Sequence, residues 1–212
     1  MKQHIPIAKE VLPFIIPAAV VTIICFFIHR YFGIAGLVIC AYILYFFRDP
    51  YRTTPQGEGL IVSPADGKVI GVDQVIDNEI FGERVWRISI FLNIFNVHVN
   101  YAPIEGNIIY IKYRQGSFFP ANSEKSAIAN ESNSIGIESN KERTVIVKQI
   151  AGLIARRIVC YCKLNDSLEI GQKIGLIRFG SRVEVYMPLS TTLKIKKGDS
   201  VKGKITVLGV KR

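Results

Sequence analysis

The sequence predicts a mostly β protein in which an apolar α-helical hairpin precedes an all-β domain. From residue 12 to residue 47 only three side chains are strongly polar. Residues 51–212 instead read as short runs of alternating apolar and polar side chains separated by Gly, Pro, Asn and Asp, which is typical of strands joined by turns. We therefore expect a membrane-associated helical hairpin over residues 1–50 and a β-rich domain over residues 51–212.

The apolar segment predicts two helices rather than one. A single helix over residues 12–47 would measure about 54 Å, whereas the hydrocarbon core of a bilayer is about 30 Å thick. It would also place Arg30 near the bilayer centre, at a cost of several kcal/mol. We expect a hinge where His29, Arg30 and Gly33 interrupt the run. Each helix is short for a full span, so a re-entrant or interfacial hairpin is an alternative.

The flanking charges predict the orientation of the hairpin. Lys2 and Lys9 precede it, and Arg48 and Arg52 follow it, so both ends are expected to be cytoplasmic by the positive-inside rule. A secretory signal peptide is the alternative, but a second apolar run follows the first and no small-residue cleavage pattern separates them. The predicted location is the cell membrane, with the β domain on the cytoplasmic side.

The net charge is +10, from 27 basic and 17 acidic residues. Such an excess favours an anionic partner, either nucleic acid or an acidic membrane surface. The hairpin favours the membrane. The sequence also lacks a basic groove studded with aromatic residues and a helix that could enter a nucleic-acid groove, so we expect no nucleic-acid partner.

The β domain is expected to contain many short strands and no amphipathic helix longer than two turns. Residues 115–142 are polar and aperiodic, and we expect them to form a long loop. Residues 170–175 and 195–203 resemble the turn-and-strand units of lipoyl and biotinyl carrier domains, which are sandwiched β-barrels. The physical basis is that Gly supplies a positive φ in tight turns and Asp hydrogen-bonds the turn backbone. The strands expected from the sequence are 60–62, 67–76, 84–92, 97–101, 106–114, 143–150, 152–162, 172–178, 182–187, 192–196 and 200–208.

Three short patterns could carry chemistry. His98 is the only histidine of the β domain, Asp66 lies in a Ser-Pro-Ala-Asp-Gly turn, and Gly180-Ser181 interrupts two β runs. Each has an ordinary reading, respectively a structural strand histidine, a turn aspartate and a β-bulge. The functional reading of the third is that the Ser181 hydroxyl attacks the Gly180 carbonyl, which glycine leaves approachable. No His, Cys or Asp cluster has zinc-binding spacing, so no metal is expected.

Taken in order, these patterns resemble the short form of the phosphatidylserine decarboxylase proenzyme family. The resemblance extends from about residue 40 to the C-terminus, and the apolar N-terminal hairpin also fits. Each motif is weak alone, whereas the ordered set is specific. The matching segments are Ser63–Gly67, Asn96–Asn100, Gly171–Gly175 and Arg178–Pro188.

The resemblance implies an enzyme that makes its cofactor from its own chain. Cleavage between Gly180 and Ser181 would give a β chain, residues 1–180, and an α chain, residues 181–212, that stay together as a heterodimer. Ser181 would become a covalent pyruvoyl group, without metal or pyridoxal phosphate. That group would form a Schiff base with phosphatidylserine of the membrane, which would lose CO2 to become phosphatidylethanolamine.

The resemblance also assigns roles to two side chains. His98 would act as the general acid–base in cleavage, in decarboxylation or in both. Asp66 would orient His98 or help to deprotonate Ser181, as in a Ser-His-Asp set. One position departs from the family. The long form has a second histidine where this chain has Tyr101, and short-form relatives tend to have a basic residue there. Either His98 serves both steps, or cleavage uses Asp66 without a histidine.

Two other functions remain as alternatives. The same chemistry could act on an ether lipid such as archaetidylserine. A non-enzymatic, membrane-anchored carrier-like β module would also explain the anchor and the turns, although the lysine motif that carries the modification in such domains is missing. Assembly of several copies is left open.

Overall fold

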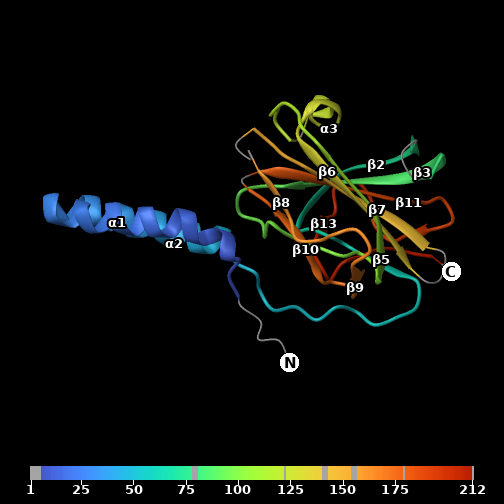
Figure 1. Ribbon diagram of the computed structural model, residues 1–212, viewed down its shortest axis with the longest axis horizontal. Coiled ribbons are helices and arrows are strands. Elements are labelled where there is room, and N and C mark those ends of the chain that lie inside the picture. The colour runs from blue at the N-terminus through green and yellow to red at the C-terminus, as the bar shows by residue number, and fades with distance from the viewer. Residues whose placement is uncertain are drawn as a thin grey trace. The chain divides into compact units, whose positions relative to one another are not determined.

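The computed structural model describes residues 6–77, 81–121, 123–139, 143–153, 157–178 and 180–211. The chain divides into two compact units, Met1–Tyr51 and Arg52–Arg212. The first unit contains the short 3-10 helix η1 (Lys9–Val11) and the helices α1 (Leu12–Ile28) and α2 (Arg30–Phe46). The second unit is built of strands and one short helix, α3 (Glu124–Ala129). The expected mostly β fold with an apolar helical pair at the N-terminus is therefore confirmed (Figure 1).

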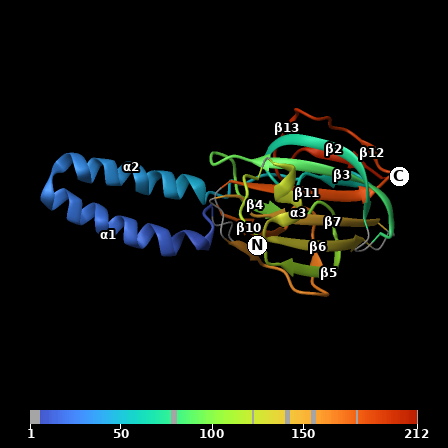
Figure 2. The ribbon, with the colours of Figure 1, turned by 90° about the horizontal axis from the view of Figure 1, so that it is seen from above.

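The helix break falls where the sequence predicts it. His29 has an extended backbone, with φ −163° and ψ 131°, and separates α1 from α2. The two helices lie side by side (Figure 2). A Cβ atom added to Gly33 would lie 2.2 Å from the Phe26 ring, and one added to Gly36 would lie 2.5 Å from Thr22 Oγ1. These glycines let the two backbones approach closely, as small residues do in membrane helix pairs.

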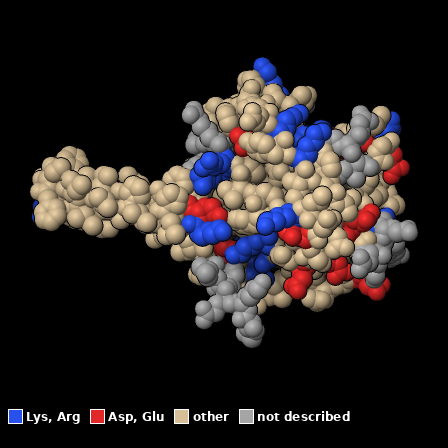
Figure 3. Space-filling model, in the orientation of Figure 1, with Lys and Arg blue, Asp and Glu red and all other residues tan. Residues whose placement is uncertain are grey.

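The surface of the helical pair is apolar on most sides. Lys9–Ile28 is long and apolar enough to cross a membrane, whereas the apolar helix Arg30–Phe46 is shorter. Large apolar side chains are open to the surroundings, among them Phe27 at 88% and Val38 at 65% exposure. In the space-filling view almost no charge lies on this unit, whereas the β unit carries both signs (Figure 3). Such a surface suits lipid better than water.

The second unit is organised around an eight-stranded antiparallel sheet. Two three-stranded sheets complete it, with the orders β1-β14-β12 and β4-β10-β8. In spatial order the large sheet consists of β13 (Ser200–Val201), β2 (Gly67–Asp77), β3 (Glu83–Leu92), β11 (Ser181–Pro188), β7 (Arg143–Ile150), β6 (Ser132–Ser139), β5 (Gly106–Arg114) and β9 (Ser167–Leu168). The smaller sheets contain β1 (Leu60–Val62), β14 (Val207–Val210), β12 (Thr192–Leu193), β4 (Val99–Tyr101), β10 (Lys173–Ile177) and β8 (Ile158–Cys160).

The core lies against one face of the large sheet, which we call the inner face. On β11 the inner side chains are Val183, Val185 and Met187, all fully buried, and Ser181 continues this row by alternation. Neighbouring strands contribute Leu, Ile and Val to the same core. The inner face is polar toward the Ser181 end of β11, where Gln149 of β7 is also fully buried. The apolar core therefore supports a polar end, which contains the residues singled out from the sequence.

The long loop expected over residues 115–142 is wrong. Helix α3 and strand β6 lie within this range, and β6 forms a regular ladder with both β5 and β7. The inward side chains of β6 include Asn133 as well as Ile135 and Ile137. Because part of this inward row is polar, the sequence lacks the alternation of apolar and polar residues that would have predicted a strand.

The strand expected over residues 200–208 is paired only at its ends, as β13 and β14. Between them the chain turns, and Lys204 has a positive φ of 69°. The expected turn chemistry is confirmed, because Asp199 Oδ2 accepts a hydrogen bond from the Lys196 amide at 2.9 Å and Gly198 has φ 99°. The relationship to carrier domains stays a prediction.

Candidate active site

Gly180 and Ser181 lie at the polar end of the core. Gly180 has φ 62°, a left-handed conformation that glycine adopts without strain. Ser181 is the first residue of β11, pairs with Leu92 of β3 and is fully buried. Its Oγ has no hydrogen-bond partner among the described residues. A buried hydroxyl left unpaired costs about 1–3 kcal/mol, and such groups in folded proteins are often reactive ones.

The structure brings His98 to the peptide group of Gly180. The fully buried ring accepts a hydrogen bond at Nε2 from the Gly180 amide, at 3.3 Å. Its Nδ1 lies 3.0 Å from the Asn96 carbonyl oxygen. Because a carbonyl can only accept and an amide N–H can only donate, the proton of the neutral ring belongs on Nδ1. The unprotonated nitrogen, Nε2, therefore faces the Gly180-Ser181 segment.

Asp66 lies in the turn between β1 and β2, and its carboxylate is bound by other groups. Arg52 donates to both oxygens, from Nη1 at 2.5 Å and Nη2 at 2.8 Å, and the Gly203 amide donates to Oδ1 at 2.8 Å. The contact that orients His98 through Nδ1 comes from the Asn96 carbonyl. The role of Asp66 in any reaction stays a prediction.

The Tyr101 side chain is packed in the interior of the β unit. Its ring is fully buried, a Cβ atom added to Gly203 would lie 2.9 Å from it, and the Lys204 ammonium lies 4.9 Å from its centroid. The cation beside Asp66 comes instead from Arg52. Nothing in the sequence singled out Arg52 for this contact, because the two residues belong to different local patterns.

Gly152 is a second residue that the sequence analysis missed. A Cβ atom added to it would lie 2.0 Å from the Gly180 carbonyl oxygen and 3.2 Å from the Ala121 Cβ. The backbone of Gly152 is thus packed against the oxygen of the carbonyl that precedes Ser181. The only signal in the sequence is a glycine placed just after a strongly alternating strand.

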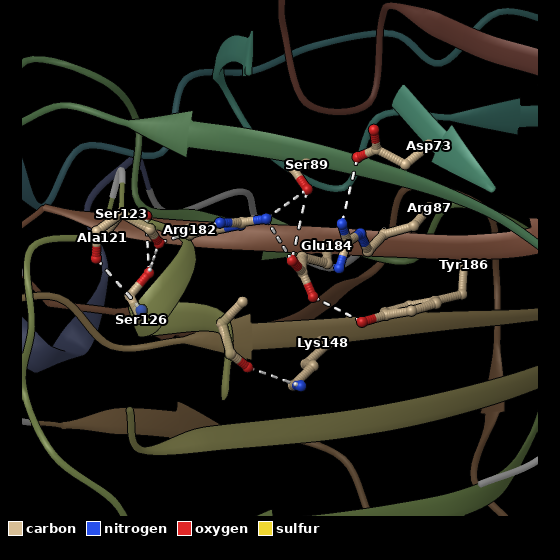
Figure 4. A network of polar contacts seen from close by, with 11 residues as sticks. Asp73, Arg87, Ser89, Ala121, Ser123, Ser126, Lys148, Arg182, Glu184 and Tyr186 are labelled. Atoms are coloured by element: carbon tan, nitrogen blue, oxygen red, sulfur yellow. Dashed lines mark hydrogen bonds and ion pairs between the residues drawn. The ribbon is translucent and has the colours of Figure 1, made fainter. Parts of the chain in front are cut away.

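On the outer face of β11 a buried polar network fixes the strand just beyond Ser181 (Figure 4). Arg182 Nη2 lies 2.6 Å from Glu184 Oε1 and donates to Ser89 Oγ at 2.8 Å. The Tyr186 hydroxyl donates to Glu184 Oε2 at 2.6 Å. Burial, reinforced by the Glu184 carboxylate, raises the pKa of Tyr186, so this hydroxyl stays a neutral donor. Arg182 also reaches the Ser123 carbonyl just before α3, at 3.4 Å.

The arrangement can support acyl chemistry within the chain. Among the described residues it contains a buried hydroxyl without a hydrogen-bond partner, an adjacent glycine carbonyl and an imidazole whose unprotonated nitrogen accepts from the Gly180 amide. In the part of the chain that the structure describes, no group of three or more His, Cys, Asp or Glu residues could hold a metal ion. An all-β unit with this serine–histidine pair, following an apolar helical hairpin, defines a candidate membrane-associated enzyme.

Comparison with known proteins names the family. A family model described as phosphatidylserine decarboxylase matches residues 39–209. A phosphatidylserine decarboxylase proenzyme of Syntrophus aciditrophicus is 43% identical over 211 residues, which cover 99% of each chain. One of Desulfotalea psychrophila is 41% identical over 214 residues, covering 99% of this chain and 98% of the relative. The chain belongs to the phosphatidylserine decarboxylase family, as the ordered motifs led us to expect.

The ion pair on the outer face generates a prediction about stability. Replacing Glu184 by Gln leaves Arg182 buried without its counter-charge, and breaking such a pair costs roughly 3 kcal/mol or more. We expect a clear fall in the thermal unfolding midpoint of the purified protein in detergent. Glu83→Gln is the matched control, because Glu83 is exposed on β3. Equal unfolding midpoints for the two variants would show that the pair does not stabilise β11.

Proposed function

We propose that the chain is a self-cleaving proenzyme that matures into a pyruvoyl-dependent phosphatidylserine decarboxylase. The observation that carries the proposal is the unpaired, buried Ser181 hydroxyl next to Gly180, whose amide is bound by His98. Family membership and the printed names of the relatives, which call them proenzymes, support it. The substrate follows from the same names, and the apolar hairpin supports a substrate that resides in a bilayer.

Cleavage would begin at the Gly180 carbonyl carbon. Ser181 Oγ attacks this carbon while its proton passes to a base, and the Gly180–Ser181 amide bond breaks to leave an ester and a free Ser181 amine. A base then removes the Ser181 Cα proton, and the Cβ–Oγ bond breaks. Gly180 leaves as a carboxylate that keeps Oγ. Water replaces the amine nitrogen of the remaining dehydroalanine, ammonia departs, and a pyruvoyl group remains at residue 181.

Three features of the chain support these steps. Gly180 has a positive φ, and among the described residues other than its chain neighbours no atom lies within 4 Å of its would-be Cβ, which supports a peptide open to attack. Gly152 lies behind the carbonyl oxygen. His98 Nε2 is unprotonated and binds the Gly180 amide, one peptide bond before the bond to be cleaved, so it can take up a proton nearby and return it later.

The residues around position 181 also fit the mature cofactor. A pyruvoyl group at residue 181 would supply a carbonyl to bind the substrate amine as an imine and an acceptor for the electron pair left on the substrate carbon when CO2 departs. After cleavage residue 181 becomes a chain end that β3 still holds, while the Arg182–Glu184 pair anchors the next residues. The buried inner face around it excludes water, and His98 can supply the proton that the substrate carbon needs.

The helical pair would hold the enzyme at the bilayer, so that only the lipid headgroup has to enter the site. We propose a location on the cytoplasmic face, by the positive-inside rule. The net charge of +10 favours a surface rich in anionic lipid, of which phosphatidylserine is one.

The first test is the intact mass of the protein expressed in membranes. We expect two fragments, residues 1–180 and residues 181–212, the smaller one blocked to N-terminal sequencing because it lacks an amine. Ser181→Ala should stay whole, because it lacks the nucleophile. A wild-type chain that stays whole in its native membrane would contradict the proposal. A cleaved protein that releases no CO2 from phosphatidylserine would point to another substrate, such as the ether lipid considered above.

A second prediction separates His98 from Asp66. We expect His98→Gln to slow self-cleavage by roughly 100-fold or more, because general acid–base catalysis contributes about that much. Asp66→Asn should retain more of the cleavage, since its carboxylate binds Arg52 and Gly203. Cleavage half-times from gel band intensities, together with unfolding midpoints, make the comparison. Rapid cleavage in the His98 variant and none in a folded Asp66 variant would reverse the assignment.

A third prediction concerns Gly152. Gly152→Ala places a methyl group against the Gly180 carbonyl and must displace it, so we expect self-cleavage to slow at least roughly 10-fold. Gly71→Ala on β2 is the matched control, because its added Cβ would meet only the mobile end of Asp73 closer than 3.5 Å. If the two variants were equally fast, Gly152 would have no part in placing the carbonyl.

A further inference from the structure

Three buried amide side chains form a chain beside the candidate active site. Asn133 Nδ2 donates to Gln149 Oε1 at 3.0 Å, and Gln149 Nε2 donates to Asn100 Oδ1 at 2.9 Å. Asn100 and Gln149 are fully buried, and Asn133 is 2% exposed. Gly175, which pairs with Asn100 across β4 and β10, makes room for this contact, since a Cβ atom there would lie 2.8 Å from Gln149 Nε2.

The direction of the hydrogen bonds in this series of amides leaves one N–H donor, Asn100 Nδ2, without an acceptor in the series. Each amide gives its NH2 group to the oxygen of the next, so the last amide, Asn100, receives a bond on Oδ1 and keeps Nδ2 for another acceptor. Among the described residues Nδ2 has no hydrogen-bond partner, although it is fully buried. A buried donor without an acceptor costs about 1–3 kcal/mol. An acceptor supplied by a ligand would remove that cost.

Strand pairing relates the position of this donor to that of the reacting residues. Gln149 pairs with Val183 on β11, and Ser181 is two residues before Val183 on the same inner face. Such diagonal neighbours on adjacent strands are roughly 7 Å apart. Likewise His98 precedes Asn100 by two residues on the same side of the chain, which is again roughly 7 Å. A headgroup attached at residue 181 can therefore reach Asn100.

We propose that Asn100 Nδ2 binds the carboxylate of the serine headgroup, an inference that rests on the proposed function. The headgroup has two anionic groups, and the depth of Asn100 distinguishes between them. The substrate amine is fixed at residue 181, and the phosphate must lead outward to the acyl chains in the bilayer. The carboxylate is the group left to enter the buried interior, where Asn100 lies.

A neutral donor suits a carboxylate that must leave as CO2. A guanidinium or ammonium group would bind it through a full ion pair as well as a hydrogen bond. The ion pair would be lost as the carboxylate becomes neutral CO2, and the reaction would be slowed accordingly. The amide chain from Asn133 through Gln149 fixes the donor without adding a charge.

Binding of two unreactive lipids to the mature protein tests the proposal without relying on activity. Short-chain phosphatidyl-3-hydroxypropionate carries the carboxylate but no amine, and phosphatidylethanol lacks both. We expect Asn100→Leu to weaken binding of the first about 10-fold or more, as for a lost hydrogen bond to a charged group. Binding of the second should stay unchanged. Isothermal titration calorimetry measures both dissociation constants.

Further variants guard against a mere folding defect. Asn100→Asp keeps the volume and the acceptor for Gln149 but repels a carboxylate, so it should show the same selective loss. Asn107→Leu, on an exposed position of β5, is the matched control and should bind both lipids as the wild type does. Equal losses for both lipids, or none, would overturn the assignment of Asn100. Failure of the wild type to cleave itself and release CO2 would instead overturn the proposed function.

Discussion

The pairing of β11 between β3 and β7 is the constraint on which the site depends. This strand begins at Ser181, pairs with β3 from Leu92 to Val85, and pairs with β7 over residues 182–186. A strand inside a sheet has its backbone hydrogen bonds satisfied on both sides, so it keeps its place without help from the chain before it. A break just before Ser181 would therefore leave the new chain end where the old peptide was, which a proenzyme of this kind requires.

The two faces of β11 have different roles, one stabilising the strand and the other carrying the reactive groups. On the outer face, the Arg182–Glu184 ion pair and its hydrogen bonds to the Ser89 and Tyr186 hydroxyls fix the first residues of β11 after Ser181. Two polar atoms near the site have no hydrogen-bond partner among the described residues: Ser181 Oγ on the inner face, and Asn100 Nδ2 on β4 of the neighbouring sheet. Each is unfavourable for folding alone, and the apolar core from Val183 to Met187 offsets the cost. Stability on one face thus permits a reactive, unpaired hydroxyl on the other.

The sequence predicted those parts of the structure that depend on local patterns. Arg30 within an apolar run predicts the helix break, and a Gly-Ser step between two β runs predicts the start of β11. It could not predict that Arg52 neutralises Asp66 or that Gly152 lies behind Gly180, because these contacts join segments distant in the chain. Asn133 and Gln149 were missed for another reason: an inward amide on a strand has the same appearance in sequence as an exposed one.

The ion pair of Asp66 with Arg52 is relevant to the tyrosine that this chain has at position 101. A buried carboxylate without a cation is strongly unfavourable, and a basic residue at position 101 would provide one. Here position 101 holds a packed tyrosine, and Arg52 binds the carboxylate through both oxygens from another part of the chain. The Gly203 amide adds a third hydrogen bond to this carboxylate. Arg52 thus supplies the positive charge beside Asp66 in this chain, whatever side chain stands at position 101.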